Sequence, residues 1–396
     1  MQEIDAIIVG CGLSGAVVGR CLAEELDKKV LFIDRRNHIG GNLYDYQNDA
    51  GILVHQYGPH TFHTKKKYLY DYICRYGEWN KYKLTCGAVI NGKYTPTPFN
   101  FQTIDDFFQI DKAERIKQEI KKEYPAQNMA SVLELLNHSN EAIQEYAQFL
   151  FDNDYSLYTA KQWGCSPKDI DPGVLNRVPL RFNYETGYFD DEFQVMPQVS
   201  YKSFFDNLLN HPNINILLNT DALKYIRLEM KEHEIYMEGR LWNKPLIYTG
   251  AIDELMDWKY GKLPYRSLFF EWKTENRKSF QDAPVVAYPQ AEKYTRITEY
   301  TKLPVQEAAG RTTYAIEYPL AYQPNMDAEP YYPIPNKDNY ELYEKYRSAI
   351  ESVHNLYLCG RLAEYQYYNM DQALENALKL CEVLKINYAG EKGSGY

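Results

Sequence analysis

The sequence has 396 residues, with 44 Lys and Arg against 54 Asp and Glu, so its formal net charge is −10. This acidic balance argues against a nucleic-acid-binding surface, which needs clustered positive charge. No apolar run approaches the roughly 20 residues of a membrane-spanning helix. The acidic start lacks the pattern of a signal peptide. Seven scattered cysteines contain no Cys-x-x-Cys pair and predict neither a disulfide framework nor a thiolate metal site. We therefore expect a cytoplasmic protein of two or three domains.

The beginning of the chain carries a dinucleotide-binding pattern. An apolar run over 4–9 predicts a buried parallel strand and leads directly into Gly10-Cys11-Gly12-Leu13-Ser14-Gly15. A helical pattern follows, and a second apolar run over 30–33 ends at Asp34. In such a unit the first glycine permits a tight turn, the second lets a pyrophosphate approach the backbone, and the third packs helix against strand. Asp34 can accept hydrogen bonds from ribose hydroxyls.

A second glycine pair, Gly40-Gly41, follows Asp34 closely. Ordinary NAD-binding units do not require it, but the pattern resembles the extended FAD-binding signature of glutathione-reductase-like flavoproteins and amine-oxidase relatives. No second G-x-G-x-x-G occurs later, so we expect no separate nicotinamide domain. We expect FAD, bound in this part of the chain by Gly10, Gly12, Leu13, Ser14, Gly15, Asp34, Arg35, Gly41 and Asn42.

The rest of the chain predicts a helical insert, proline-punctuated loops and then strands. Helical periodicity covers 103–124 and 131–151, with Ser131 and Glu134 spaced as a capping box. Strands are predicted at 213–218, in parts of 223–248, at 267–272, 312–318 and 356–360, and a last helix at 371–384.

These elements predict an α/β fold with three domains. A Rossmann-like, glutathione-reductase-like FAD-binding domain is expected from 1–76, 195–240 and 345–390. A helical substrate-capping insert is expected from 100–178, with a mobile loop near 165–180. An antiparallel β-sheet substrate domain is expected from 77–99, 179–194 and 241–344, and a disordered tail from 391–396.

Five stretches together resemble the bacterial UDP-galactopyranose mutase family: 57–64, 158–164, 181–189, 294–299 and 360–371. They occur in family order and cover nearly the whole chain. The resemblance implies a redox-neutral interconversion of UDP-galactopyranose and UDP-galactofuranose that requires reduced FAD. It implies that N5 of the reduced flavin attacks the anomeric carbon, that UDP leaves, and that a flavin iminium holds the sugar until the furanose closes.

The resemblance also assigns the site. It implies that Arg177 and Arg296 hold the diphosphate and that His60 and His63 lie beside the isoalloxazine. Arg177 follows Trp163 in a loop that we expect to close over the substrate. The histidines lack a carboxylate or thiol partner at metal-ligand spacing, so we expect no metal site. The implied substrate contacts are Tyr158, Thr159, Trp163, Asn183, Tyr188, Phe189, Tyr332, Arg361 and Tyr367. The further cofactor contacts are His60, Thr249, Gly360, Arg361, Met370 and Asp371.

Two positions that bear on sugar recognition differ from the family pattern. The family usually has Asp where this chain has Asn369 and Asn where it has Ala287, so galactose, N-acetyl and deoxy sugars all remain candidates. The flavin reductant, NAD(P)H or a reductase, is unidentified, and we expect a homodimer. Two other functions are considered. One is an amine-oxidase-like FAD oxidoreductase acting on a small molecule, and the other is a catalytically idle flavin or UDP-sugar binding module.

Overall fold

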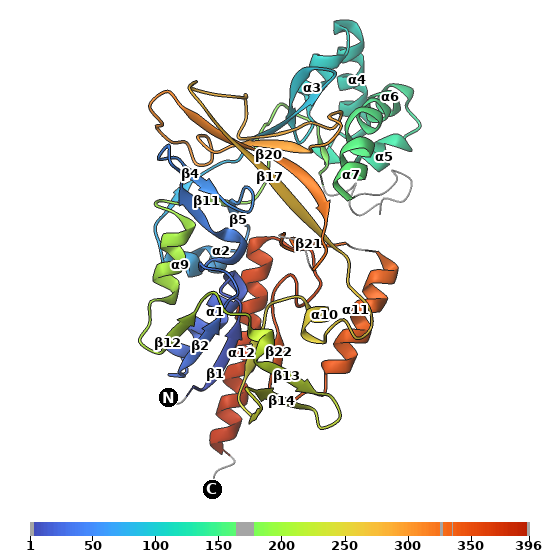
Figure 1. Cartoon of the computed structure of the whole chain (residues 1–396). Coiled ribbons are helices and arrows are strands. Elements are labelled where there is room, and N and C mark those ends of the chain that lie inside the picture. Colours follow the sequence, from blue (N-terminus) through green and yellow to red (C-terminus); the bar gives the residue numbers. More distant parts are fainter. Residues whose placement is uncertain (1–3, 164–177, 325–327, 335, 394–396) are drawn as a thin grey trace.

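In the computed structural model the chain forms three parts stacked along one direction (Figure 1): a parallel α/β layer, a long sheet and a group of helices. The structure describes residues 4–163, 178–324, 328–334 and 336–393. The long strands β17 (Tyr265–Glu275) and β20 (Thr312–Ala321) run between the α/β part and the helices. Within the described ranges, no helix is both long and apolar enough to cross a bilayer.

The parallel sheet confirms the predicted nucleotide-binding architecture. Its strand order is β12-β2-β1-β16-β22, and all of its pairings are parallel. Helix α1 (Leu13–Glu24) follows β1 directly and packs against α12 and α9. The other bounds are β1 Ala6–Val9, β2 Val30–Ile33, β12 Ile214–Leu217, β16 Leu246–Tyr248, β22 Leu356–Leu358, α9 Tyr201–Leu209 and α12 Met370–Gly393.

Two features differ from the expected domain division. Strand β16 lies in the parallel sheet between β1 and β22, although 241–344 was assigned to the antiparallel sheet domain. All three of its residues are buried, so the strand shows no alternation that would reveal its sheet type. Helix α12 extends to Gly393, beyond the start of the tail expected at 391.

The central sheet has the order β21-β17-β20-β19-β18-β7-β8. Its pairings are antiparallel except for β18 with β7, which is parallel, so the sheet is mixed. Strands β17 and β20 pair over their length, from Arg266–Ala321 to Glu275–Thr312. The remaining strands are β21 Tyr332–Pro333, β19 Arg296–Glu299, β18 Val285–Ala287, β7 Cys86–Ile90 and β8 Lys93–Thr97.

The helical part has its own buried core, which includes Ile104, Ile116 and Ile143. Its two predicted long helices are each divided, the first by extended backbone at Phe108. The Ser131 hydroxyl accepts from the Glu134 N–H at 3.2 Å, as the capping pattern predicts. The helices are α3 Phe101–Phe107, α4 Ile110–Glu123, α5 Val132–Leu136, α6 Glu141–Leu150, a π-helical turn Phe151–Tyr155 and α7 Ser156–Trp163.

Short elements connect these parts. A hairpin and three small sheets comprise β3 Asp45–Gln47, β4 Leu53–His55, β5 Phe62–Thr64, β6 Trp79–Lys81, β9 Met129–Ala130, β10 Leu180–Arg181, β11 Phe193–Pro197, β13 Ile226–Glu229, β14 Glu234–Met237 and β15 Arg240–Trp242. The other helices are α2 Lys67–Cys74, α10 Ile252–Leu255 and α11 Lys337–Ile350, with 3-10 turns at Gly41–Leu43 and Ala222–Lys224.

Candidate active site

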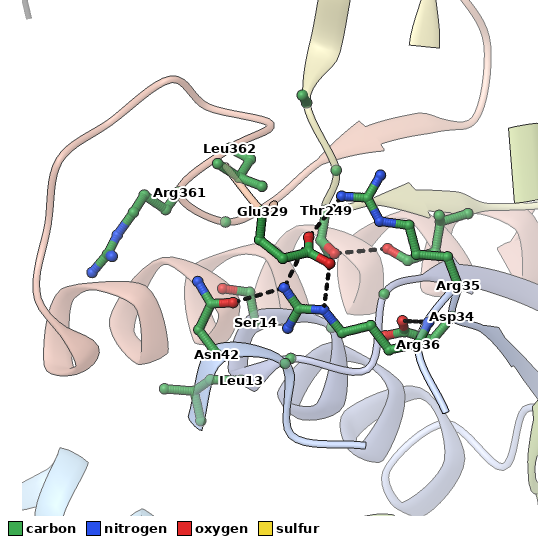
Figure 2. Close-up of a pocket in the computed structure, with 18 of the residues that line it drawn as sticks. Leu13, Ser14, Asp34, Arg35, Arg36, Asn42, Thr249, Glu329, Arg361 and Leu362 are labelled. Atoms are coloured by element: carbon green, nitrogen blue, oxygen red, sulfur yellow. Dashed lines mark hydrogen bonds and ion pairs between the residues drawn. The ribbon is translucent and has the colours of Figure 1, made fainter. Parts of the chain in front are cut away.

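A cleft lies at the carboxyl ends of the parallel strands, where doubly wound sheets bind their ligands (Figure 2). Most of the residues predicted to bind the cofactor line it, although they come from distant parts of the chain. They are Gly10, Gly12, Leu13, Ser14, Gly15, Asp34, Arg35, Gly41, Asn42, His60, Thr249, Gly360, Arg361 and Met370. Asp371 does not line the cleft; its Oδ1 accepts from the Gln372 N–H at 2.8 Å at the start of α12.

The three glycines of the first turn differ in what surrounds them. A Cβ on Gly10, whose φ is +104°, would lie 2.1 Å from Thr249 Oγ1, and one on Gly15 would lie 2.2 Å from the Gly10 carbonyl oxygen. A Cβ on Gly12 would have the Gly41 Cα at 3.7 Å as its only neighbour within 4 Å among the residues that the structure describes. Gly10 and Gly15 are therefore required by the packing of the protein itself, whereas Gly12 keeps the cleft open at the start of α1.

The Asp34 carboxylate holds the glycine turn in place. Its Oδ2 accepts from the Cys11 N–H at 2.7 Å and its Oδ1 accepts from the Arg36 N–H at 2.9 Å. A carboxylate has about four acceptor positions. Asp34 can therefore order the turn and still accept a further hydrogen bond from a ligand in the cleft.

Arg36 and Glu329 form an ion-pair cluster that the sequence analysis missed. The Arg36 guanidinium lies 4.3 Å from the Tyr57 ring centroid and donates to Asn42 Oδ1 at 2.9 Å. Glu329 pairs with Arg36 at 3.1 Å and with Arg35 at 2.9 Å (Figure 2). The adjacent arginines were visible in the sequence, but nothing indicated that an acid from the connection between β20 and β21 would join them.

A buried histidine, His55, and a half-buried one, His60, lie close together at the cleft. His60 lines the cleft, and its backbone N–H donates to His55 Nδ1 at 3.1 Å. Burial lowers the pKa of His55 to about 3, and burial together with the charges of His55 and Arg361 lowers the pKa of His60 to about 3. His60 Nδ1 is buried without a hydrogen-bond partner among the described residues. The lowered pKa keeps the imidazole of His60, in the lining of the cleft, neutral near pH 7.

His63, which we expect beside the flavin, contacts residues of the segment 189–191 in this structure. Its Nδ1 pairs with Asp191 Oδ2 at 2.8 Å, and its ring stacks on Phe189 at a centroid distance of 3.6 Å. His63 is not among the residues that line the cleft. It lies on β5, where pairing with β11 places it opposite Gln194 and turns it toward the segment that follows Tyr188.

We expect acid to destabilise the protein through His55. Its pKa is about 3 when folded against 6.5 normally, so the unfolded chain binds more protons between these values. The contribution of neutral His55 to the free energy of unfolding is complete above pH 6.5. It decreases as the pH is lowered, by about 2 kcal/mol at pH 5. Denaturant unfolding should therefore show that the free energy of unfolding falls between pH 7 and pH 5 by about 2 kcal/mol less in His55→Asn than in wild type. His354→Asn, at an exposed position, is the control, and an unchanged dependence in His55→Asn would contradict the assignment.

A cluster of arginines surrounds Tyr332 next to the cleft. The guanidinium carbons of Arg266 and Arg361 each lie 4.7 Å from the Tyr332 ring centroid. Burial by itself raises the pKa of Tyr332, but Arg361, Arg266 and Arg296 outweigh burial and lower it. Tyr367 joins the cluster through its ring, whose centroid is 4.9 Å from that of Tyr332. The cluster is thus a strongly positive region in a protein whose net charge is −10.

Arg296 is held at the first position of β19 by an acid on the next strand. Its Nε and Nη2 donate to Glu317 Oε2 at 2.9 and 2.8 Å, and the two residues are directly opposite in the β19–β20 register. Burial lowers the pKa of Arg296, but Glu317 outweighs burial and raises it well above normal. Burial also raises the pKa of Tyr158 on α7, and the charge of Arg296 opposes that shift. Tyr158 therefore belongs to the same electrostatic cluster.

The other residues that we expect to contact the substrate lie in different surroundings. Thr159 is buried in α7, and Tyr188 lies within electrostatic reach of Tyr158. The Asn183 side chain accepts from the Glu185 N–H at 2.9 Å in a local turn. Trp163 ends α7, but its side chain lies outside the described part of the structure, as do Arg177 and residues 164–177 of the expected mobile loop.

The fold and the cleft define an α/β enzyme with a dinucleotide-type cleft next to a guanidinium cluster. A family model described as UDP-galactopyranose mutase matches residues 153–367, and one described as an NAD(P)-binding Rossmann-like domain matches residues 8–76. The UDP-galactopyranose mutase of Mycoplasma genitalium is 36% identical over 390 residues, covering 97% of this chain and 95% of the relative. The chain therefore belongs to the UDP-galactopyranose mutase family and is an isomerase, as its motifs predict.

Two further comparisons bear on the breadth of this family. The dTDP-fucopyranose mutase of Escherichia coli is 33% identical over 382 residues, covering 95% of this chain and 97% of the relative. A crystal structure of reduced UDP-galactopyranose mutase superimposes with a TM-score of 0.72 over 98% of this chain and 95% of that chain, at 16% identity. This structural match supports the fold.

Proposed function

We propose that the enzyme interconverts UDP-galactopyranose and UDP-galactofuranose with reduced FAD bound in the cleft. One observation carries the proposal. Arg361 lines the cofactor cleft and also lies against Tyr332 in the guanidinium cluster. The cleft and the cluster therefore adjoin, so a sugar whose diphosphate is held by the arginines would lie beside the cofactor.

The residues of the cleft fit FAD. Gly12 begins α1 without a side chain that caps the helix, so the first-turn N–H groups and the positive end of the helix are available to a pyrophosphate. Asp34 retains acceptor capacity for ribose hydroxyls, and the imidazole of His60 is part of the lining of the cleft. When bound and reduced, the flavin would supply a nucleophilic N5 for the anomeric carbon of the sugar.

The protein would supply charge stabilisation and orientation. Departure of UDP develops negative charge on the diphosphate, and an arginine about 4 Å away contributes roughly 4 kcal/mol before desolvation at an effective dielectric of about 20. Arginine suits this role because its fork can bind two phosphate oxygens. We assign this task to Arg296, with Arg177, which follows α7 in the sequence, and assign phosphate hydrogen bonds to Tyr332 and Tyr367. Tyr158 and Tyr188 would contact the nucleotide side of the substrate.

A redox comparison tests this function. UDP-galactofuranose is offered to the same flavoprotein after dithionite reduction and after air oxidation, and UDP-galactopyranose and hydrogen peroxide are measured. The proposal predicts turnover with the reduced protein and none with the oxidised protein. Turnover only after oxidation, accompanied by peroxide, would favour an amine-oxidase-like oxidoreductase. Absence of turnover under full reduction would favour a binding module.

The identity of the sugar is tested separately. Ala287 lies directly opposite Arg296 in the β18–β19 register, and Asn369 lines the cleft. Both positions are therefore close enough to the proposed substrate to affect sugar selection. We propose galactose, and comparison of kcat/KM for UDP-galactose, UDP-N-acetylgalactosamine and dTDP-fucose would test this choice.

We also propose that an external reductant, NAD(P)H or a reductase, reduces the flavin, which anaerobic flavin bleaching would test. We further propose a homodimer, which light scattering would test.

A further inference from the structure

The ammonium group of Lys161 lies in a cage of backbone carbonyls. Lys161 is half-buried on α7, and its Nζ donates to the carbonyl oxygens of Tyr288 at 2.9 Å, Pro289 at 3.0 Å, Tyr294 at 2.8 Å, and Ala291. All of these carbonyls belong to the loop that joins β18 to β19. An ammonium has three N–H groups, so its charge as well as its hydrogen bonds holds the carbonyl dipoles together.

This loop leads directly to Arg296. Arg296 begins β19 two residues after Tyr294. The loop is also fixed by Gln290, whose Nε2 donates to Asn91 Oδ1 at 2.8 Å and to Asn153 Oδ1 at 3.2 Å. Asn153 belongs to the π-helical turn before α7, so the loop is attached to the helical part at two points.

Tyr158 lies one turn before Lys161 on the same face of α7. Helix α7 lies beside β20, the strand that carries Glu317 (Figure 1). The Lys161 cage therefore links the helix that carries Tyr158 to the loop that leads to Arg296. These two residues already share one electrostatic cluster.

One buried acid, Asp154, acts on the charge of Lys161. Burial lowers the pKa of Lys161 below its ordinary value, and the charge of Asp154, which is buried in the π-helical turn, opposes that shift. Burial raises the pKa of Asp154 to about 7, and the charge of Lys161 opposes that shift. Four carbonyl oxygens converging on one charge resemble the ligand set of a monovalent cation.

We propose that Lys161 is a positioning residue whose ammonium acts as a tethered cation. It fixes the β18–β19 loop and thereby sets the separation of Arg296 and Tyr158 for binding the diphosphate. The proposal rests on the proposed mutase function for its activity readout. Truncation of the side chain would release the loop, and a misplacement of about 1 Å in a binding site can cost about 100-fold in rate.

The test uses the reduced holoenzyme and chemical rescue. Lys161→Ala should lower kcat/KM about 100-fold and weaken the binding of UDP measured by calorimetry. Ethylammonium at high concentration should raise the kcat/KM of this variant at least tenfold. Lys161→Met fills the channel left by the lysine stem and should not respond to ethylammonium. Lys293→Ala, at an exposed lysine of the same loop, should match wild type.

The outcomes separate this inference from the function on which it rests. A wild-type enzyme without turnover would reject the proposed function, whereas the UDP affinity of Lys161→Ala would still report on the loop. Wild-type kcat/KM and UDP affinity in Lys161→Ala would overturn the inference. A loss of activity in Lys161→Ala that parallels its thermal unfolding, and that ethylammonium does not restore, would also overturn the inference. Should Lys161→Ala not fold, Lys161→Gln should show at least tenfold weaker UDP binding, and unchanged binding would reject the proposal.

Discussion

Exchange of Arg296 for lysine should lower kcat by about 100- to 1000-fold, the usual cost of removing one transition-state charge contact. Lysine keeps a positive charge beside Glu317, which is 1% exposed and would otherwise be a buried unpaired carboxylate. It loses the planar fork that can hold Glu317 and a phosphate oxygen together. The measurement is steady-state turnover of UDP-galactofuranose by the reduced enzyme, with folding monitored by circular dichroism.

Arg277 provides the matched control. Its Nε pairs with Glu275 Oε2 at 2.8 Å at the exposed end of β17. Arg277→Lys should leave kcat unchanged. Equal activities of Arg296→Lys and wild type would remove Arg296 from the catalytic machinery, and equal losses in both variants would indicate a general effect of the substitution.

Replacement of Gly12 by alanine should remove flavin from an otherwise folded protein. The added methyl would meet only the Gly41 Cα, at an ordinary contact distance of 3.7 Å, among the described residues. It would, however, occupy the surface on which we place the pyrophosphate. Overpacking of this kind costs about 1–3 kcal/mol, or roughly 5- to 150-fold in Kd. Flavin content after gel filtration and the Kd from flavin fluorescence would measure the loss.

Two other glycines separate the cofactor effect from a folding effect. Gly15→Ala should destabilise the protein with or without flavin, because its methyl would lie 2.2 Å from the Gly10 carbonyl oxygen. Gly77→Ala should change neither property, because its nearest contact would be Phe204 at 3.6 Å. Full flavin content and normal affinity in Gly12→Ala would contradict the placement of the pyrophosphate.

The sequence predicted local structure well where one short segment contained the whole signal. The strand, glycine turn, helix and second strand lie within the first 34 residues, and the structure assembles them in parallel as expected. The order in which later strands enter the sheets was not visible. Strand β16 is too short to show a pattern, and the break at Phe108 falls within a continuous amphipathic periodicity.

Site residues were predictable where a motif or a family resemblance named them. The glycine residues, Asp34 and Asn42 line the cleft as the motif predicts, and Arg296 and Tyr332 share one cluster. The partners of these residues were not predictable, because Glu329 and Glu317 come from other segments of the chain. The partner of His63 was not predictable either, because the pairing of β5 with β11 directs this side chain to Asp191.

In the proposed reaction the cofactor, rather than an amino-acid side chain, carries the hexose while the arginines retain UDP. The most direct measurement is the mass of the cofactor recovered after quenching the reduced enzyme with cyanoborohydride during turnover of UDP-galactose. We expect FAD that carries one hexose in wild type, and a much smaller amount of this adduct in Arg296→Lys. Unmodified cofactor together with a hexose bound to the polypeptide, under conditions of full turnover, would contradict the proposed reaction.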